Sequence, residues 1–161
     1  INSQYIKNME SAKLSEIISK YWDDMGWKPL SKEWAIELSI LIKDSMIRLT
    51  DSIDQSKPFF LLPKIQKEGQ DFLEKNDGKV SLKLILNYLI KKNTAKLDEE
   101  KAKDIINDIS KTHNVKKGIL MKSLRVALFG SLNGPDLIQS WVLFSDNKSD
   151  ISRIERCLKL T

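Results

Sequence analysis

Apolar side chains recur every three or four residues along almost the whole chain, which is the spacing of one face of an α-helix. Leu14, Ile18 and Trp22 form one such stripe, and Leu124 and Leu128 belong to another. Neither the alternating pattern of a strand pair nor an internal repeat is found. The sequence therefore predicts an all-α protein, built as two packed helical bundles.

Capping residues and helix breakers divide this pattern into separate helices. Ser31 and Asp98 stand where N-caps are expected, because their side-chain oxygens can accept the free N–H groups of a first turn. Gly26 and Gly130 are placed to end helices, since glycine adopts the left-handed conformation that is common there. Pro135 fits the first turn of a later helix.

Two interruptions are expected inside the chain. Residues 56–58 (Ser-Lys-Pro) predict a helix break, and the short, proline-bounded apolar block at 59–63 indicates a plug over the edge of a core. A second interruption is expected between residues 93 and 94 (Asn-Thr). It predicts a first helical subdomain at 1–93 and a second at 94–161.

Composition excludes several classes of protein. Of the 161 residues 41% are apolar, which is ordinary for a globular chain, and no stretch reaches the roughly 18 apolar residues of a membrane span. The single cysteine, Cys157, cannot form an internal disulfide, and with His113 as the one histidine it cannot supply a zinc site. We expect a cytoplasmic protein without a metal. Because the chain starts at Ile1 and not at Met, we also expect it to be part of a longer protein.

The net charge of +5 arises in one segment near the C-terminus. No acidic residue lies between Asp108 and Asp136, whereas the remainder of the chain holds 22 basic and 22 acidic residues. The five basic residues of the segment are Lys111, Lys116, Lys117, Lys122 and Arg125. Local positive potential attracts polyanions, so the segment points to a nucleic acid; the alternative is a solvated basic face.

Arg125 is the most informative of these cations. The chain has 23 Lys and only four Arg, and a guanidinium offers a planar fork that suits phosphates and base edges where an ammonium is a point charge. Lys122 lies three residues earlier, on the same helical surface. The turn at 134–136 begins another helix, whose free N–H groups can bind phosphate or base acceptors.

Signatures of catalysis are missing from the sequence. It contains no glycine-rich phosphate loop, no nucleophile elbow and no recognisable Ser, His and Asp arrangement, so no catalytic residue is predicted. Besides nucleic-acid binding, the pattern allows a helical protein-interaction module with a solvated basic face. A basic helix on an anionic membrane is less favoured, because the apolar stripes are used in a multi-helix core.

The segment 117–137 carries Lys-Gly, Met, Leu-Arg-x-Ala-Leu-x-Gly and Gly-Pro-Asp-Leu in succession. The matching residues are Lys117, Gly118, Met121, Leu124, Arg125, Ala127, Leu128, Gly130, Gly134, Pro135, Asp136 and Leu137. This pattern resembles the C-terminal anticodon-binding half of bacterial-type glutamyl-tRNA synthetases. The residues at 138–141 (Ile-Gln-Ser-Trp) look most like cyanobacterial members.

The resemblance implies an all-helical region of a class I ligase that joins glutamate to tRNA with ATP and magnesium. The family's two catalytic signatures, the HIGH-like and KMSKS-like motifs, have no counterpart here. The chain itself is therefore expected to lack the catalytic centre and to hold no cofactor. Its expected partner is the anticodon arm of tRNA, and the protein is expected to be a monomer without a membrane association.

The same resemblance implies roles for individual residues. Arg125 matches an arginine that contacts anticodon nucleotides, and Leu137 matches an apolar position that packs near them. Lys117, Lys122 and Pro135 complete the expected anticodon-binding surface.

A departure from the family concerns specificity. Alignment on Leu49 and the Phe59–Phe60 pair puts Ser45 where enzymes restricted to glutamate tRNA have an arginine that reads the last anticodon base. Serine has no bidentate fork, so the resemblance implies a non-discriminating enzyme that accepts glutamate and glutamine tRNAs and leaves a misacylated product for an amidotransferase. Arg48 could restore discrimination if the alignment is shifted by three residues.

Overall fold

A computed structural model describes residues 2–92 and 96–161 of the chain. In these ranges all regular secondary structure is helical, which confirms the predicted fold class. Two compact units are found, the first ending at Leu61 and the second running from Leu62 to Thr161. None of the helices in the described ranges is both long enough and apolar enough to cross a membrane.

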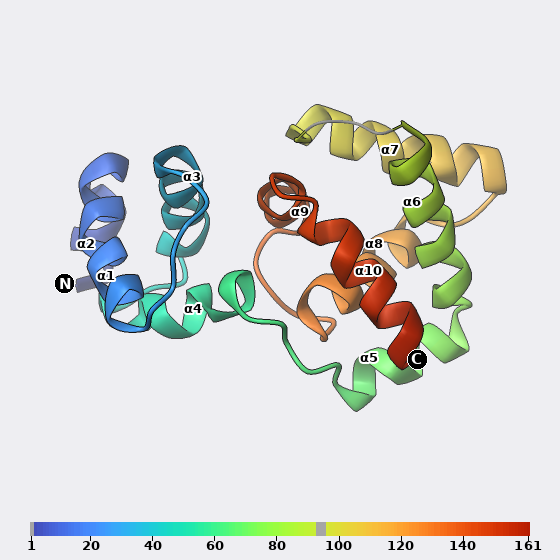
Figure 1. Cartoon of the computed structure of the whole chain (residues 1–161), viewed down its shortest axis with the longest axis horizontal. Helices are drawn as coiled ribbons and strands as arrows, with labels where there is room; N and C mark the ends of the chain where they lie inside the picture. The colour runs from blue at the N-terminus through green and yellow to red at the C-terminus, as the bar shows by residue number, and fades with distance from the viewer. Residues whose placement is uncertain (1, 93–95) are drawn as a thin grey trace. The chain divides into compact units, whose positions relative to one another are not determined.

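Four helices make up the first unit as far as it is described, from residue 2 to residue 61. They are α1 (Asn2–Asn8), α2 (Ser11–Asp24), α3 (Lys32–Lys43) and α4 (Asp51–Phe60). Gly26, with φ of +76°, closes the turn after α2, and Ser31 caps α3 by accepting the Trp34 N–H at 3.1 Å, both as predicted. Figure 1 shows α2 and α3 side by side, and these two helices pack closely.

An aromatic cluster forms the core of this unit at the end of α4. The Phe60 ring lies 5.2 Å from the ring centroid of Trp22 and 5.3 Å from those of Trp27 and Trp34. Aromatic groups at such separations contribute packing energy beyond the area that they bury. Phe59 and Phe60 thus cover a core edge, as the sequence indicates, whereas Leu61 and Leu62 of the same predicted block are exposed.

The predicted helix break at 56–58 is wrong, because α4 continues through Pro58 to Phe60. Proline removes one backbone hydrogen bond and is costly within a long helix. Here the helix ends two residues later, so few bonds depend on continuing it, and packing of Phe59 and Phe60 favours the last turn.

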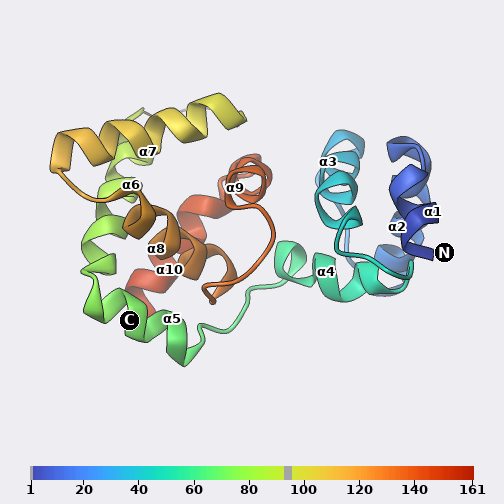
Figure 2. The same cartoon turned by 180° about the vertical axis from the view of Figure 1, so that it is seen from behind.

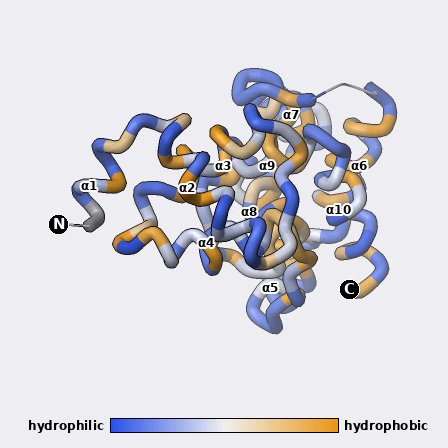
Figure 3. The backbone as a smooth tube through the Cα atoms, turned by 60° about the vertical axis from the view of Figure 1, so that its left-hand side comes forward, coloured by the Kyte–Doolittle hydropathy of each residue, from blue (hydrophilic) through white to orange (hydrophobic). Residues whose placement is uncertain are grey.

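Six helices lie in the described part of the second unit, residues 62–92 and 96–161. They are α5 (Lys67–Lys75), α6 (Gly78–Lys92), α7 (Glu99–His113), α8 (Lys117–Phe129), α9 (Leu137–Ser145) and α10 (Ser149–Leu160). Figures 1 and 2 show α8 in the middle of this unit, where it packs against the other five helices. Figure 3 shows hydrophobic and hydrophilic stretches alternating along these helices, as expected where each buries one face.

The predicted boundary between residues 93 and 94 lies outside the described residues. The compact units nevertheless differ from the predicted subdomains 1–93 and 94–161, because α6 belongs with the C-terminal helices. Leu82, Ile85 and Leu89 of α6 are buried, and the helix packs on α8 and α10. A local sequence boundary does not reveal which distant helices cover an apolar stripe.

The end of α8 is fixed by Gly130, the predicted terminator. Its φ of +72° is left-handed, and its carbonyl accepts the Gln66 N–H at 2.7 Å. A Cβ atom here would lie 2.2 Å from the Lys64 carbonyl oxygen, so only glycine allows the two backbone segments to come this close. The loop after α8 therefore starts from a defined position.

Candidate nucleic-acid interface

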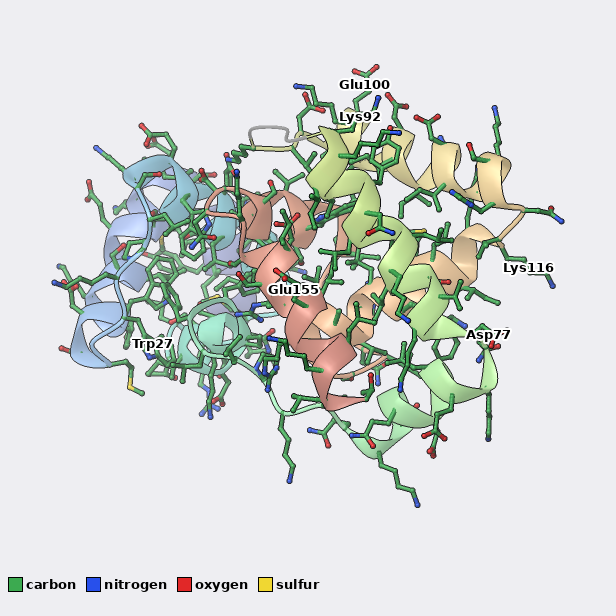
Figure 4. The ribbon with its side chains drawn as sticks, turned by 45° about the vertical axis from the view of Figure 1, so that its right-hand side comes forward. Trp27, Asp77, Lys92, Glu100, Lys116 and Glu155 are labelled. Carbon is green, nitrogen blue, oxygen red and sulfur yellow. The ribbon has the colours of Figure 1, made fainter. Side chains whose placement is uncertain are left out.

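The start of α8 presents cations to solvent. Lys116 and Lys117 are exposed, the first turn carries no acidic residue, and no side chain caps it. Figure 4 shows Lys116 at the turn between α7 and α8, directed away from the ribbon. The opposite side of α8 is buried through Leu120 and Leu124. The helix therefore holds Lys117, Lys122 and Arg125 of the acid-free segment on a rigid support.

Arg125 connects this helix to the loop that precedes α9. Its Nη1 donates a hydrogen bond to the Pro135 carbonyl at 2.8 Å, and the side chain is half-buried. A Cβ atom on Gly134 would lie 3.0 Å from the same Nη1, so glycine gives the guanidinium room to lie along the loop. The structure thus brings together Arg125 and Pro135, which the sequence analysis had placed in one surface.

The charge of Arg125 is shaped by its surroundings. Partial burial lowers the pKa of the guanidinium, and the nearby Asp136 carboxylate opposes that shift. A guanidinium has five N–H donors, of which the bond to Pro135 uses one. Arg125 is therefore a cation held in place by a backbone carbonyl. Its other N–H groups can donate to an acceptor on a ligand.

The loop between α8 and α9 is ordered by short-range hydrogen bonds. The Ser131 hydroxyl accepts the Asn133 N–H at 3.0 Å, and Asp136 caps α9 by accepting the Gln139 N–H at 2.9 Å. Leu137 is only 4% exposed, so it anchors α9 in the core. Leu137 thereby supports the loop from the core side. Its side chain offers little surface to a nucleotide in this conformation.

Lys122 has a partner that the sequence did not suggest. Its Nζ lies 5.8 Å from the ring centroid of Phe72 on α5, while the side chain remains exposed. An exposed cation–π contact of this kind is worth about 0.5–1 kcal/mol. Lys122 is therefore oriented toward α5. Arg125, one turn later in α8, contacts the loop before α9 instead.

Arg153 is a supporting residue that reasoning from the sequence missed. It is buried in α10, donates from Nη1 to the Leu128 carbonyl at 2.7 Å, and lies 4.2 Å from the Phe144 ring centroid. Burial, followed by repulsion from Arg156, lowers its pKa to about 10. It holds the last turn of α8, next to the loop that Arg125 contacts. No signal in the sequence marks it as buried, because arginine side chains are mostly exposed.

Ser45 and Arg48 lie in the first unit, in the connection between α3 and α4. Both are exposed, and Ser45 follows the end of α3 instead of lying within a helix. The Arg48 guanidinium forms an ion pair with Asp51, at 3.6 Å from Nη2 to Oδ1. Asp51 is a second residue that the sequence analysis did not identify.

Cys157 and His113, the residues with metal-binding or thiol chemistry, lie apart from the loop before α9. Cys157 is fully buried, as expected of a core residue, and burial raises the pKa of its thiol. His113 is exposed at the end of α7. Within residues 2–92 and 96–161 no three His, Cys, Asp or Glu side chains converge in a way that could hold a metal ion.

The chain matches the model of the anticodon binding domain family over residues 8–158. It is 80% identical to a glutamate–tRNA ligase of Prochlorococcus marinus strain MIT 9312, and 46% identical to that of strain NATL2A, over 99% and 98% of its own length. In both cases it spans 33% of the relative.

Solved structures share the fold. A crystal structure of a glutamate tRNA ligase from Elizabethkingia meningosepticum CCUG26117, in complex with its amino acid, superposes with a TM-score of 0.85 at 21% identity. The superposition covers 98% of this chain and 31% of that one. These matches confirm the resemblance seen in the sequence and do not favour a general protein-interaction module. The chain belongs to the anticodon binding domain family.

Proposed function

We propose that this chain binds the anticodon arm of a tRNA through the face formed by α8 and the loop before α9. The observation that carries the proposal is Arg125, a half-buried guanidinium fixed against the Pro135 carbonyl with donors still available. Unpaired loop nucleotides are recognised by cations, stacking and base-edge hydrogen bonds on a preorganised surface. The family match and the glutamate–tRNA ligase relatives support this assignment.

Charge distribution supports the same face. The acid-free segment leaves Lys116 and Lys117 exposed at the start of α8, about 12 Å along the helix from Arg125 at 1.5 Å per residue. Exposed lysines suit phosphates, whereas the fixed arginine suits a base or a phosphate that requires a defined direction. Replacing the exposed lysines and replacing Arg125 should therefore change the salt dependence of RNA binding to different extents.

Arg125→Ala tests the proposal in the full 161-residue chain. We expect binding of an anticodon stem-loop to weaken about tenfold, because a directed contact of this kind contributes about 1–3 kcal/mol. Fluorescence anisotropy at two salt concentrations measures it, and urea unfolding shows that the variant is folded. The matched control is Arg156→Ala, which removes the same charge from α10.

Two results would contradict the assignment. If the parent chain does not bind the stem-loop, the proposed function is wrong. If it binds and Arg125→Ala binds equally well, the α8 face is the wrong surface. A loss of affinity that is as large in Arg156→Ala would show that net charge alone is responsible.

The whole protein is proposed to be a ligase that joins glutamate to tRNA with ATP and magnesium. The Prochlorococcus relatives are glutamate–tRNA ligases, and this chain corresponds to a third of their length. We assign neither ATP nor magnesium to residues of this chain. The cytoplasmic location and the monomeric state expected from the sequence stay predictions of this proposal.

The finer proposal is that the ligase accepts both glutamate and glutamine tRNAs. Ser45 supports it, because an exposed hydroxyl in the α3–α4 connection cannot make the bidentate contact that an arginine would make. We expect comparable charging of the two tRNAs by the ligase that contains this chain. Charging kinetics on both tRNAs measure this, and a strong preference for glutamate tRNA would refute it.

A further inference from the structure

Arg153 joins the two helices that flank the loop before α9. It lies in α10, which packs against both α8 and α9 (Figures 1 and 2). Its Nη1 donates to the Leu128 carbonyl at 2.7 Å, and its Cζ atom lies 4.2 Å from the ring centroid of Phe144 in α9. Leu128 belongs to the last turn of α8, where carbonyls lack a partner within the helix. One side chain thus ties the end of α8 to α9.

A second aromatic ring continues this contact toward the loop. Phe144 and Phe129, the last residue of α8, meet edge to face, with ring centroids 5.7 Å apart. Both side chains are buried. Neither ring can shift alone, because protein interiors are closely packed and leave few voids. The position of Phe129 therefore depends on Phe144 and, through that ring, on Arg153.

Phe129 and Arg125 both lie against Gly134, in the loop before α9. A Cβ atom on Gly134 would lie 3.0 Å from Nη1 of Arg125 and 3.4 Å from Cδ2 of Phe129. The two side chains stand four residues apart on α8, so they share one face of the helix. The next residue, Pro135, supplies the carbonyl that holds Arg125. A displaced Phe129 would therefore move the backbone that fixes the Arg125 guanidinium.

The chemical type of Arg153 also needs a reason, because burying a guanidinium is costly. Burial lowers its pKa to about 10, so the group stays protonated at neutral pH inside the core. Apolar side chains of similar volume often fill such positions without loss of stability. A guanidinium adds what they lack, namely directed donors along its edge and a flat face for a ring. The contacts with Leu128 and Phe144 use both features.

We propose that Arg153 is a positioning residue for tRNA binding, which sets the place of the Arg125 guanidinium through the Leu128 carbonyl and the rings of Phe144 and Phe129. This inference rests on the proposed function and deepens it. Arg153 is 4% exposed, so it acts on RNA through Arg125 and not by its own contact. A directed contact must be held to within about 0.5 Å, so a small shift of the loop weakens it.

The first test needs no RNA. The chain has four arginines, so their Nε–Hε groups give four signals in a nitrogen–proton NMR spectrum of the full chain, which single substitutions assign. We expect Arg153→Met to shift the Arg125 signal, because the guanidinium loses its fixed place against Pro135. Arg156→Met, which removes the other arginine of α10, is the matched control and should leave that signal unchanged. An unchanged Arg125 signal in Arg153→Met overturns the inference.

Binding of an anticodon stem-loop is then measured in a double-mutant cycle of Arg125→Ala and Arg153→Met. Arg153→Met alone should weaken binding about fivefold, within the roughly 2- to 30-fold range of substitutions that act without touching the ligand. In the Arg125→Ala background it should have no further effect, because the group that it positions is gone. Arg156→Met should bind as the parent does.

A structural role alone is distinguished by measuring folding and affinity separately. Urea unfolding shows whether each variant is folded under the binding conditions. Arg153→Lys is the second variant, because it keeps the charge and a donor for the Leu128 carbonyl and loses the flat face. We expect it to weaken binding less than Arg153→Met, and again only where Arg125 is present. If both variants lower the free energy of unfolding and leave the affinity of the folded chain unaltered, Arg153 is structural and the inference is wrong.

The outcomes separate this inference from the proposed function. If the parent chain binds no stem-loop, the proposed function is wrong, and Arg153 has no part in RNA binding. If the parent binds and folded Arg153→Met binds equally well, only the role of Arg153 is wrong. An equal loss in the Arg125→Ala background would show that Arg153 acts independently of Arg125, and an equal loss in Arg156→Met would show an effect of net charge. Either result overturns the inference.

Discussion

At the scale of single residues, burial decides what each charged side chain does. Arg125 is half-buried against a carbonyl and keeps donors available. Arg153 is buried, donates to the Leu128 carbonyl and lies over the Phe144 ring. Arg48 is held by a carboxylate and still largely exposed. Three arginines of one chemical type thus have three roles, and only their surroundings distinguish the roles.

Asp150 leads to a prediction on pH dependence. It is 2% exposed and accepts the Trp141 indole N–H at 2.9 Å, and burial raises its pKa above the ordinary value of 3.8. A folded-state pKa above the unfolded one means that the folded protein binds the proton more tightly, so its free energy of unfolding falls as pH rises through this range. Asp150→Asn keeps an acceptor for the indole and removes the titration.

We expect Asp150→Asn to gain stability relative to the parent as pH rises from 4 to 7, with the difference vanishing near the acid end. Urea unfolding at a series of pH values measures this. Asp150→Ala is the contrast, because it leaves the Trp141 N–H buried without its acceptor and should cost about 1–3 kcal/mol at each pH. If the difference in free energy of unfolding between the parent and Asp150→Asn does not change with pH, the raised pKa of Asp150 in the folded protein is contradicted.

At the scale of elements, two close approaches of backbone fix α8 and its following loop. Gly130 passes next to Lys64, and Gly69 of α5 would place a Cβ atom 3.0 Å from a Val126 methyl group and 3.3 Å from the Gly130 carbonyl. In the sequence Gly130 predicts a helix end, whereas a glycine inside a helix such as α5 has by itself only a low helical propensity. The packing reason for Gly69 appears only when α5 and α8 are brought together.

Gly130→Ala is predicted to destabilise the chain by roughly 2 to 4 kcal/mol, because it combines a left-handed φ with a clash against backbone. Gly118→Ala in the first turn of the same helix is the control. Nothing lies within 4 Å of its added Cβ atom, so we expect no loss, or a gain of about 0.5–1 kcal/mol. Urea unfolding of both variants checks this, and equal stabilities would contradict the packing argument.

At the scale of the whole molecule, the limits of the two compact units depend on which helices share a core. Turn residues mark where helices stop, but they do not say which helices share a core. The stripe of α6 is covered by α8 and α10, which are far from it in the sequence, so α6 joins the second unit. In the first unit Phe60 closes an aromatic cluster, which keeps Pro58 within α4.

The sequence by itself determined the helical class, the caps at Ser31 and Asp98, and the family, because these depend on spacing and on local hydrogen-bond donors and acceptors. It also singled out Arg125 by its rarity among lysines. Only the tertiary structure decided that Leu137 is buried, that Pro135 supplies a carbonyl to Arg125, and that the Asp51 carboxylate accepts the Arg48 backbone N–H. Burial and contacts between distant segments are properties of the packed chain, and no local pattern encodes them.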